Sequence, residues 1–125
     1  MERVQYDILK NALDASSMRQ QAISGNIANV NTPGYKVNKV AFESLLEKAQ
    51  GGSGLNKTNE KHFGIQNVSD VKAQVGKKTT TSVQDNGNNV DIDYEMAEMA
   101  ANSLYYQSLI SQLNSKYSMF RTVIK

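Results

Sequence analysis

Two stretches of the chain, one near each end, place apolar side chains at alternating steps of three and four residues. In the C-terminal stretch, nine of the ten positions in this series are apolar or aromatic, which is typical of a coiled-coil seam. The series consists of Ile92, Met96, Met99, Ser103, Tyr106, Ile110, Leu113, Tyr117, Phe120 and Ile124. Neither Gly nor Pro occurs from Val90 to Lys125, so we expect one long helix over residues 91–125.

The N-terminal stretch has the same spacing, with two polar interruptions at Ser16 and Gln20. Its series consists of Tyr6, Leu9, Leu13, Ser16, Gln20, Ile23, Ile27 and Val30. Extra small and apolar residues, among them Ala12 and Ala15, widen this stripe and leave room for a second neighbour. This pattern predicts a second long helix that covers the seam of the C-terminal one.

Local signals mark where both helices begin and end. Asp91 and Asp93 are suited to cap the C-terminal helix, because short acidic side chains accept hydrogen bonds from the first free N–H groups. The N-terminal helix must stop near residues 29–31, because Pro33 disfavours helical geometry at the residue before it. The segment Thr32-Pro33-Gly34-Tyr35 predicts a type II turn in which Gly34 has a positive φ.

The middle of the chain, residues 37–90, has no comparable periodicity. A short helix is expected near residues 41–50, where Phe42, Leu45 and Leu46 cluster before a Gly-rich linker at residues 51–54. Residues 79–83 have strand propensity without an obvious partner strand, which leaves a hairpin as one possibility. We therefore predict an all-α fold and one structural unit, built from residues 1–36, an irregular segment 37–90 and residues 91–125.

Composition narrows the range of functions. The chain has 14 Lys and Arg against 12 Asp and Glu, and these charges are spread out, so it lacks the basic stripe that nucleic acids require. It contains no Cys, which excludes disulfides and thiolate metal sites. No apolar run approaches the roughly 20 residues of a membrane span. The first residues also lack the apolar core of a secretory signal, so we expect any export to need no cleaved signal.

No motif in the chain predicts catalysis or a cofactor. Gly76-Lys77-Lys78-Thr79 lacks the earlier Gly of a phosphate loop, and residues 85–98 fit neither register of a calcium-binding EF-hand loop. His62 is the single histidine and has no Cys with which to bind zinc. We therefore expect no enzyme activity, no cofactor and no metal.

The end of the N-terminal helix carries an unusual asparagine-rich string. It reads Asn26, Ile27, Ala28, Asn29, Val30, Asn31, Thr32, Pro33, Gly34, Tyr35 and Lys36, and it resembles the N-terminal signature of flagellar basal-body rod and hook proteins. Residues 87–96, together with the helix that ends in residues 117–124, resemble the C-terminal region of the proximal-rod subunits in that family. The two matches cover about half of the chain.

The resemblance implies an antiparallel, coiled-coil-like pair of terminal helices that packs in the wall of a hollow helical tube. That tube transmits torque and conducts exported subunits through the periplasmic or cell-wall zone of the basal body. The implied partners are other rod subunits, the adaptor between export gate and rod, the membrane ring and the export gate itself. Export through the flagellar type III apparatus would explain the missing signal, and no direct membrane insertion is implied.

These expectations give a candidate assembly seam on the two terminal helices. It consists of Leu9, Leu13, Ile23, Ile27, Ile92, Met96, Met99, Tyr106, Ile110, Leu113, Tyr117 and Phe120. A contact between unlike surfaces that does not close on itself generates a filament, as a rod requires. The alternative is a cytosolic helical-hairpin adaptor or chaperone that uses the same seams in a closed oligomer, although such a protein would not need the asparagine-rich turn.

Overall fold

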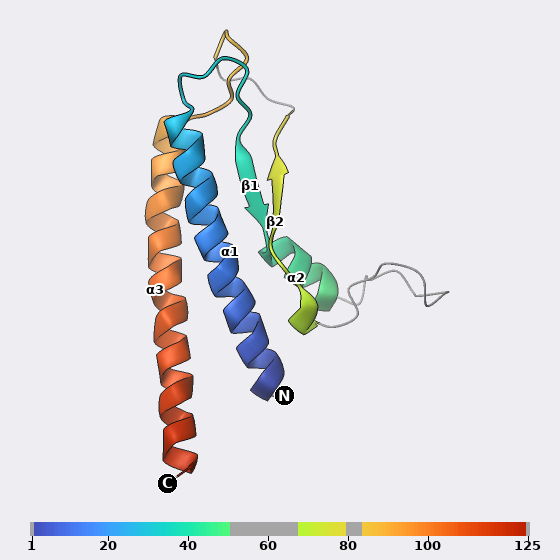
Figure 1. The fold of residues 1–125 in the computed structure, drawn as a ribbon, viewed down its shortest axis with the longest axis vertical. Helices are drawn as coiled ribbons and strands as arrows, with labels where there is room; N and C mark the ends of the chain where they lie inside the picture. The colour runs from blue at the N-terminus through green and yellow to red at the C-terminus, as the bar shows by residue number, and fades with distance from the viewer. Residues whose placement is uncertain (1, 51–67, 80–83, 125) are drawn as a thin grey trace, which may run out of the picture.

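The computed structural model describes residues 2–50, 68–79 and 84–124 of the chain. Along the sequence these form helix α1 (Glu2–Ala28), strand β1 (Asn38–Ala41), helix α2 (Glu43–Gln50), the 3-10 turn η1 (Val68–Asp70), strand β2 (Gln74–Lys77) and helix α3 (Ile92–Val123) (Figure 1). Helix dominates, and the predicted long terminal helices are confirmed. The expectation of an all-α fold is wrong in one respect, because β1 and β2 form a small sheet.

The two long helices run antiparallel and side by side (Figure 1). With 32 residues, α3 is about 48 Å long at 1.5 Å per residue, and it extends past the N-terminal end of α1. The sheet and α2 pack on the other side of α1, so α1 lies between them and α3. One helix therefore supports both the rest of the fold and the longer helix, while the side of α3 turned away from α1 is uncovered within the described part of the chain.

The ends of both helices follow the predicted local chemistry. Asp91 caps α3, with its carboxylate accepting hydrogen bonds from the backbone N–H groups of Asp93 at 3.1 Å and Tyr94 at 3.3 Å. After α1 ends, Tyr35 N donates to Thr32 O at 3.2 Å, and Gly34 has φ 70°. These are the features of the predicted type II turn.

The sheet joins two segments that are far apart in the sequence. β1 pairs antiparallel with β2, in a register that matches Asn38 with Lys77 and Ala41 with Gln74. Every residue of β2 is exposed, so the strand shows no alternation of buried and exposed positions that could reveal it in the sequence. The expected linker at residues 51–54 and most of the strand-prone stretch 79–83 lie outside the described residues.

A small apolar core lies where the sheet, α2 and η1 meet α1 and the middle of α3. Its buried members are Leu9, Ala12, Ala15, Phe42, Val71 and Leu109. The two alanines on α1 allow close approach of Phe42 and Val71, the largest core side chains contributed by the middle of the chain. In the described ranges, no helix is both long enough and apolar enough to cross a membrane.

Candidate assembly interface

Asn26 is the central residue of a hydrogen-bonded cluster where α1 ends and α3 begins. Its buried amide nitrogen donates to Asn38 O and to Glu95 Oε2, both at 3.0 Å. Its amide oxygen accepts from Asn38 N at 2.9 Å and from Tyr35 Oη at 3.3 Å. One side chain thus joins α1, β1 and α3, and its donors and acceptor are all used.

Asn88, which is completely buried, secures the loop that enters α3 to the end of α1. Its amide nitrogen lies within 2.8–3.0 Å of the carbonyl oxygens of Asn29, Val30 and Thr32. Its amide oxygen accepts from Val90 N at 2.7 Å. These carbonyls belong to the turn after α1, where Asn29 O and Thr32 O also accept backbone hydrogen bonds, and Asn88 adds a side-chain donor that ties the two segments together.

The neighbouring residue, Asn89, holds the same loop to the sheet. Its amide oxygen accepts from Val37 N, and its amide nitrogen donates to Lys78 O, both at 2.7 Å. The turn after α1 and the turn before α3 lie close together here, since a Cβ on Gly87 would lie 3.8 Å from the Cα of Gly34. Gly34 and Gly87 both have positive φ. We refer to Asn26, Asn29, Tyr35, Asn38, Asn88, Asn89 and Glu95 as the asparagine cluster.

Other residues of the predicted motif take lesser parts. Asn29 donates to Gly25 O at 2.8 Å and accepts from Thr32 Oγ1 at 3.1 Å. Ile27 is half-buried, whereas Ala28, Asn31 and Pro33 are exposed. The local sequence indicated a polar helix end, but it did not reveal that the partners are Asn88, Asn89 and Glu95, which lie far along the chain.

The face of α3 that packs on α1 is centred on Glu95, Asn102 and Leu109, the three buried residues of the helix. Asn102 Oδ1 accepts from Ser16 Oγ at 2.9 Å, and its nitrogen donates to Ser16 O at 3.0 Å and to Gln20 Oε1 at 3.1 Å. Within the described residues, no buried side-chain polar atom lacks a partner. The contact between the two helices is therefore polar toward the asparagine cluster and apolar toward Leu109.

Most of the predicted seam of α3 is turned away from α1, although Tyr117 meets Tyr6 of α1. Its outer members are between 40% and 58% exposed: Ile92, Met96, Tyr106, Tyr117 and Phe120. Met99, Ile110 and Leu113 are half-buried at its edge. On α1, by contrast, the predicted residues do turn inward, with Leu9 and Ile23 buried and Leu13 and Ile27 half-buried. The expectation that α1 covers the α3 seam is thus wrong for its outer members other than Tyr117, which keeps a contact with Tyr6.

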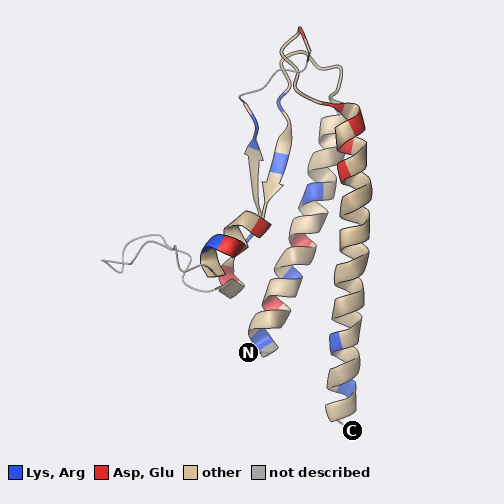
Figure 2. Cartoon of the chain, turned by 180° about the vertical axis from the view of Figure 1, so that it is seen from behind, with Lys and Arg blue, Asp and Glu red and all other residues tan. Residues whose placement is uncertain are grey.

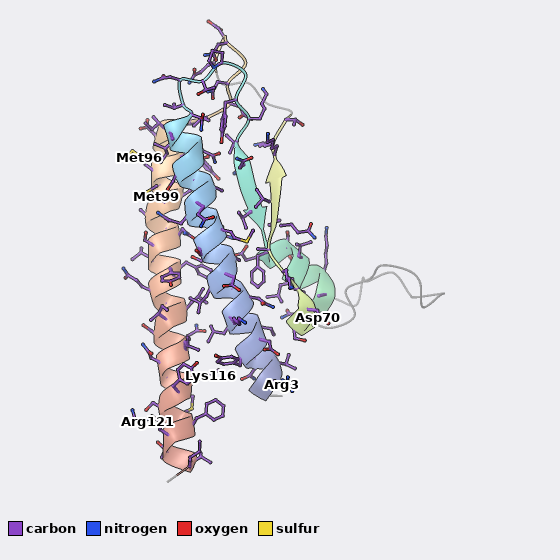
Figure 3. The ribbon with its side chains drawn as sticks, in the orientation of Figure 1. Arg3, Asp70, Met96, Met99, Lys116 and Arg121 are labelled. Carbon is purple, nitrogen blue, oxygen red and sulfur yellow. The ribbon has the colours of Figure 1, made fainter. Side chains whose placement is uncertain are left out.

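We call the exposed series Ile92, Met96, Tyr106, Tyr117 and Phe120 the α3 stripe. Figure 3 shows Met96 on the side of α3 that is turned away from α1. Periodicity alone could not place the stripe, because it identifies an apolar face without showing which neighbour covers it. The stripe is a candidate for contact with other chains, because its five side chains are large, apolar or aromatic, and exposed.

Charge along α3 is separated toward its two ends (Figure 2). Asp93, Glu95 and Glu98 lie near the N-terminal end, and Lys116 and Arg121 lie near the C-terminal end, as the helix dipole favours. Residues 99–115 between them carry no charged side chain. A solvent-facing helix normally carries charges along its length, so this uncharged span is more typical of a helix that neighbours cover.

At the open end of the pair, aromatic and basic residues join α3 to α1. The hydroxyl oxygens of Tyr6 and Tyr117 are 2.8 Å apart, and their rings meet edge to face at 6.2 Å. This hydrogen bond raises the pKa of Tyr117. Lys116 Nζ also donates to Gln5 Oε1 at 2.6 Å. Among the described residues, no cluster of His, Cys, Asp or Glu is suited to hold a metal, and His62 lies outside them.

Comparison with known proteins gives a consistent family. A family model described as flagella basal body rod protein matches residues 7–36, the helix and turn that carry the asparagine-rich string. Flagellar basal body rod protein FlgB of Bacillus subtilis is 39% identical over 116 residues, which are 93% of this chain and 89% of that protein. The FlgB of Aeromonas hydrophila is 38% identical over 122 residues, covering 96% and 92% of the two chains.

A more distant relative, the FlgB of Escherichia coli K12, is 31% identical over 121 residues, covering 91% of this chain and 88% of the relative. With more than nine-tenths of this chain covered, the alignments are not confined to the asparagine-rich string. The resemblance based on that string is thereby confirmed. The chain belongs to the FlgB family of flagellar basal body rod proteins and is a structural subunit of the rod.

Proposed function

We propose that this chain occupies the proximal part of the rod and joins neighbouring rod subunits through the α3 stripe. Membership of the FlgB family supports the rod role. The observation that carries the proposed interface is the stripe itself, in which five large apolar or aromatic side chains on one helix are at least 40% exposed. A monomer rarely leaves a series of large apolar side chains along one helix in contact with water.

The uncharged span 99–115 supports the same interface. Burying an unpaired charge between packed helices costs several kcal/mol, so a helix destined for burial excludes charges along its contact length. Met96 lies just before this span, and Tyr106 lies within it. Covering them with a neighbour's apolar surface would contribute roughly 1.5–3 kcal/mol for each fully buried side chain.

The asparagine cluster and the sheet play a supporting role in this proposal. They hold the end of α1 against the start of α3, so that each subunit presents its α3 stripe in one orientation. Repetition of a contact between the stripe and a different surface of the next subunit builds an open helical array. A tube made in this way would transmit torque and leave a channel for exported subunits.

The proximal position implies further partners at the membrane end of the rod. These are the adaptor between export gate and rod, the membrane ring and the export gate. The names of the relatives, which are rod proteins, support a purely structural role without enzymatic activity. The alternative of a cytosolic hairpin adaptor or chaperone in a closed oligomer is not favoured, because the relatives that match almost the whole chain are rod subunits.

Charge substitution in the α3 stripe tests the interface. Met96→Asp and Tyr106→Asp alter exposed side chains, so we expect the far-ultraviolet circular dichroism of the purified chain to stay as in the wild type. In cells that depend on the variant, we expect rods to be missing from isolated basal bodies and motility to be lost, because each carboxylate would be desolvated in the contact. Ser44→Asp, an exposed position of α2, adds the same charge and serves as the control.

We expect Ser44→Asp to assemble and to restore swimming. Normal rods in cells carrying Met96→Asp and Tyr106→Asp would exclude the stripe as the subunit interface. Failure of all three variants would also count against it, since the effect would then belong to added charge and not to the stripe.

A further inference from the structure

The α3 helix has two neighbouring faces that compete for α1, and the less apolar one is used. Glu95, Asn102 and Leu109 repeat every seven residues and face α1. One residue later in each repeat are Met96, Ser103 and Ile110, about 100° further around the helix. Apolar burial alone would favour the second face, so another interaction must determine the choice.

That interaction is available at two buried polar layers between the helices. In the first, Asn102 uses its amide oxygen and both amide hydrogens on Ser16 and Gln20, at 2.9–3.1 Å. In the second, Glu95 accepts from Asn26 at 3.0 Å. All of these contacts are buried or partly buried, and both layers consist of groups that are costly to bury without a partner.

Rotation of α3 by one residue would remove both layers. Met96 would replace Glu95 opposite Asn26, and the shorter Ser103 would replace Asn102 opposite Ser16 and Gln20. The amide of Asn26 would lose a hydrogen-bond acceptor that a thioether does not replace. Ser16 and Gln20, the two polar interruptions in the apolar series of α1, are thus the hydrogen-bond partners of Asn102. Asn102 itself lies outside the apolar series of α3.

We infer that these two polar layers determine which face of α3 packs on α1, and that they thereby keep the α3 stripe turned outward. Asn102, Ser16 and Gln20 are positioning residues for α3. They act on assembly through the orientation of the helix and not through contact with a neighbour. The inference rests on contacts within one chain, so its failure would leave the family and the rod role unaffected.

Single cysteine reporters measure the orientation of α3, because the chain has no cysteine of its own. The outward reporter is Ser103→Cys, at a position where the native side chain is exposed. The inward reporter is Leu109→Cys, at a position where the native side chain is 6% exposed. With a neutral maleimide and dilute full-length protein, we expect the outward thiol to react about tenfold faster, because access to the thiol limits its labelling.

The decisive variant removes the two side-chain partners of Asn102 on α1 and leaves only the backbone carbonyl of Ser16. In Ser16→Ala with Gln20→Leu, the amide stays buried without its side-chain partners, which favours rotation toward the apolar face. We expect labelling of the outward reporter to slow, labelling of the inward reporter to accelerate, and the ratio of the two rates to fall below about threefold. Adding Asn102→Leu removes the unpaired amide, so we expect the triple variant to recover a ratio near that of the wild type.

The matched control is Ser24→Ala with Gln21→Leu, which makes the same two changes at exposed positions of α1. We expect it to retain the wild-type labelling ratio. An unchanged ratio in the Ser16 and Gln20 double variant would overturn the inference. So would a parallel change in both reporters, which would mean that the layers hold the helices together without selecting a face. A labelling ratio in the triple variant that lies further from the wild-type ratio than in the double variant would also overturn the inference. It would mean that these side chains act through packing and not through their hydrogen bonds.

Discussion

Replacement of Asn88 by Ala tests the asparagine cluster more sharply than any other single change. The Asn88 side chain is completely buried, and its amide lies within 3.0 Å of three carbonyl oxygens and accepts from one backbone N–H. Its two amide hydrogens and one accepting contact correspond to about three hydrogen bonds. At about 1 kcal/mol each, their loss lowers the free energy of unfolding by about 3 kcal/mol.

This loss is large compared with the typical effect of a point substitution, which is about 1 kcal/mol. Urea titration of the purified chain, followed by circular dichroism, measures the difference. With a slope of about 1.5 kcal/mol per molar urea, the midpoint should fall by about 2 M. Asn31→Ala is the control, because it makes the same change at an exposed residue of the neighbouring turn after α1, and it should shift the midpoint by less than about 0.3 M.

Equal midpoints for Asn88→Ala and Asn31→Ala would refute this reasoning, since the cluster would then contribute nothing to holding the helices together. A lower midpoint with a changed slope would instead indicate that the variant had altered the denatured or native ensemble. The two outcomes separate a lost set of hydrogen bonds from a change in compactness.

Two further changes test single contacts. Gly34→Ala should lower the free energy of unfolding by roughly 1–2 kcal/mol, because the φ of Gly34 is 70°. Nothing lies within 4 Å of an added Cβ, so the penalty comes from the backbone alone. An unchanged urea midpoint would contradict this prediction. Arg19→Gln should lower it by less than about 0.5 kcal/mol at pH 7, because Glu43 is half-exposed. Burial raises the pKa of Glu43, but hydrogen bonds and the charge of Arg19 bring it below its ordinary value of 4.5. A lowered pKa stabilises the folded chain above pH 4.5, and this contribution is lost as the pH falls through the folded-state pKa, so the difference between Arg19→Gln and wild type should vanish once the pH is below that pKa. A difference that persists at that pH would mean that the Arg19 side chain acts through packing.

Features with a local cause were predictable from the sequence. The cap at Asp91, the stop before Pro33 and the positive φ of Gly34 each depend on a few adjacent residues. The same holds for the length of α3, since an uninterrupted seam pattern without Gly or Pro defines it. These elements agree with the structure because no distant residue has to be known to place them.

Contacts between distant segments were not predictable in this way. Asn88 and Glu95 are both buried and bond to residues at the end of the N-terminal helix, and the sequence alone did not predict either contact. Strand β2 is exposed at every position and so lacks a pattern. The local spacing of a single asparagine or acid does not show which distant residue will bond to it.

The α3 stripe shows a different limit of pattern analysis. The spacing identified the apolar series correctly, but it assigned the series to contact with α1. The polar pairs of Asn102 with Ser16 and of Glu95 with Asn26 account for the difference, because buried polar groups require partners whereas apolar groups accept any apolar surface. The departure from the expected seam therefore leaves most of the α3 stripe uncovered within the chain.

The most direct test of the subunit interface is the structure of the assembled rod, determined by electron microscopy of isolated basal bodies that contain this chain. We predict that Met96 and Tyr106 are buried against a neighbouring subunit, while Asn102 keeps its hydrogen bonds to Ser16 within the same chain. A rod in which the α3 stripe faces solvent, or in which it packs on α1 of its own chain, would contradict the proposed interface.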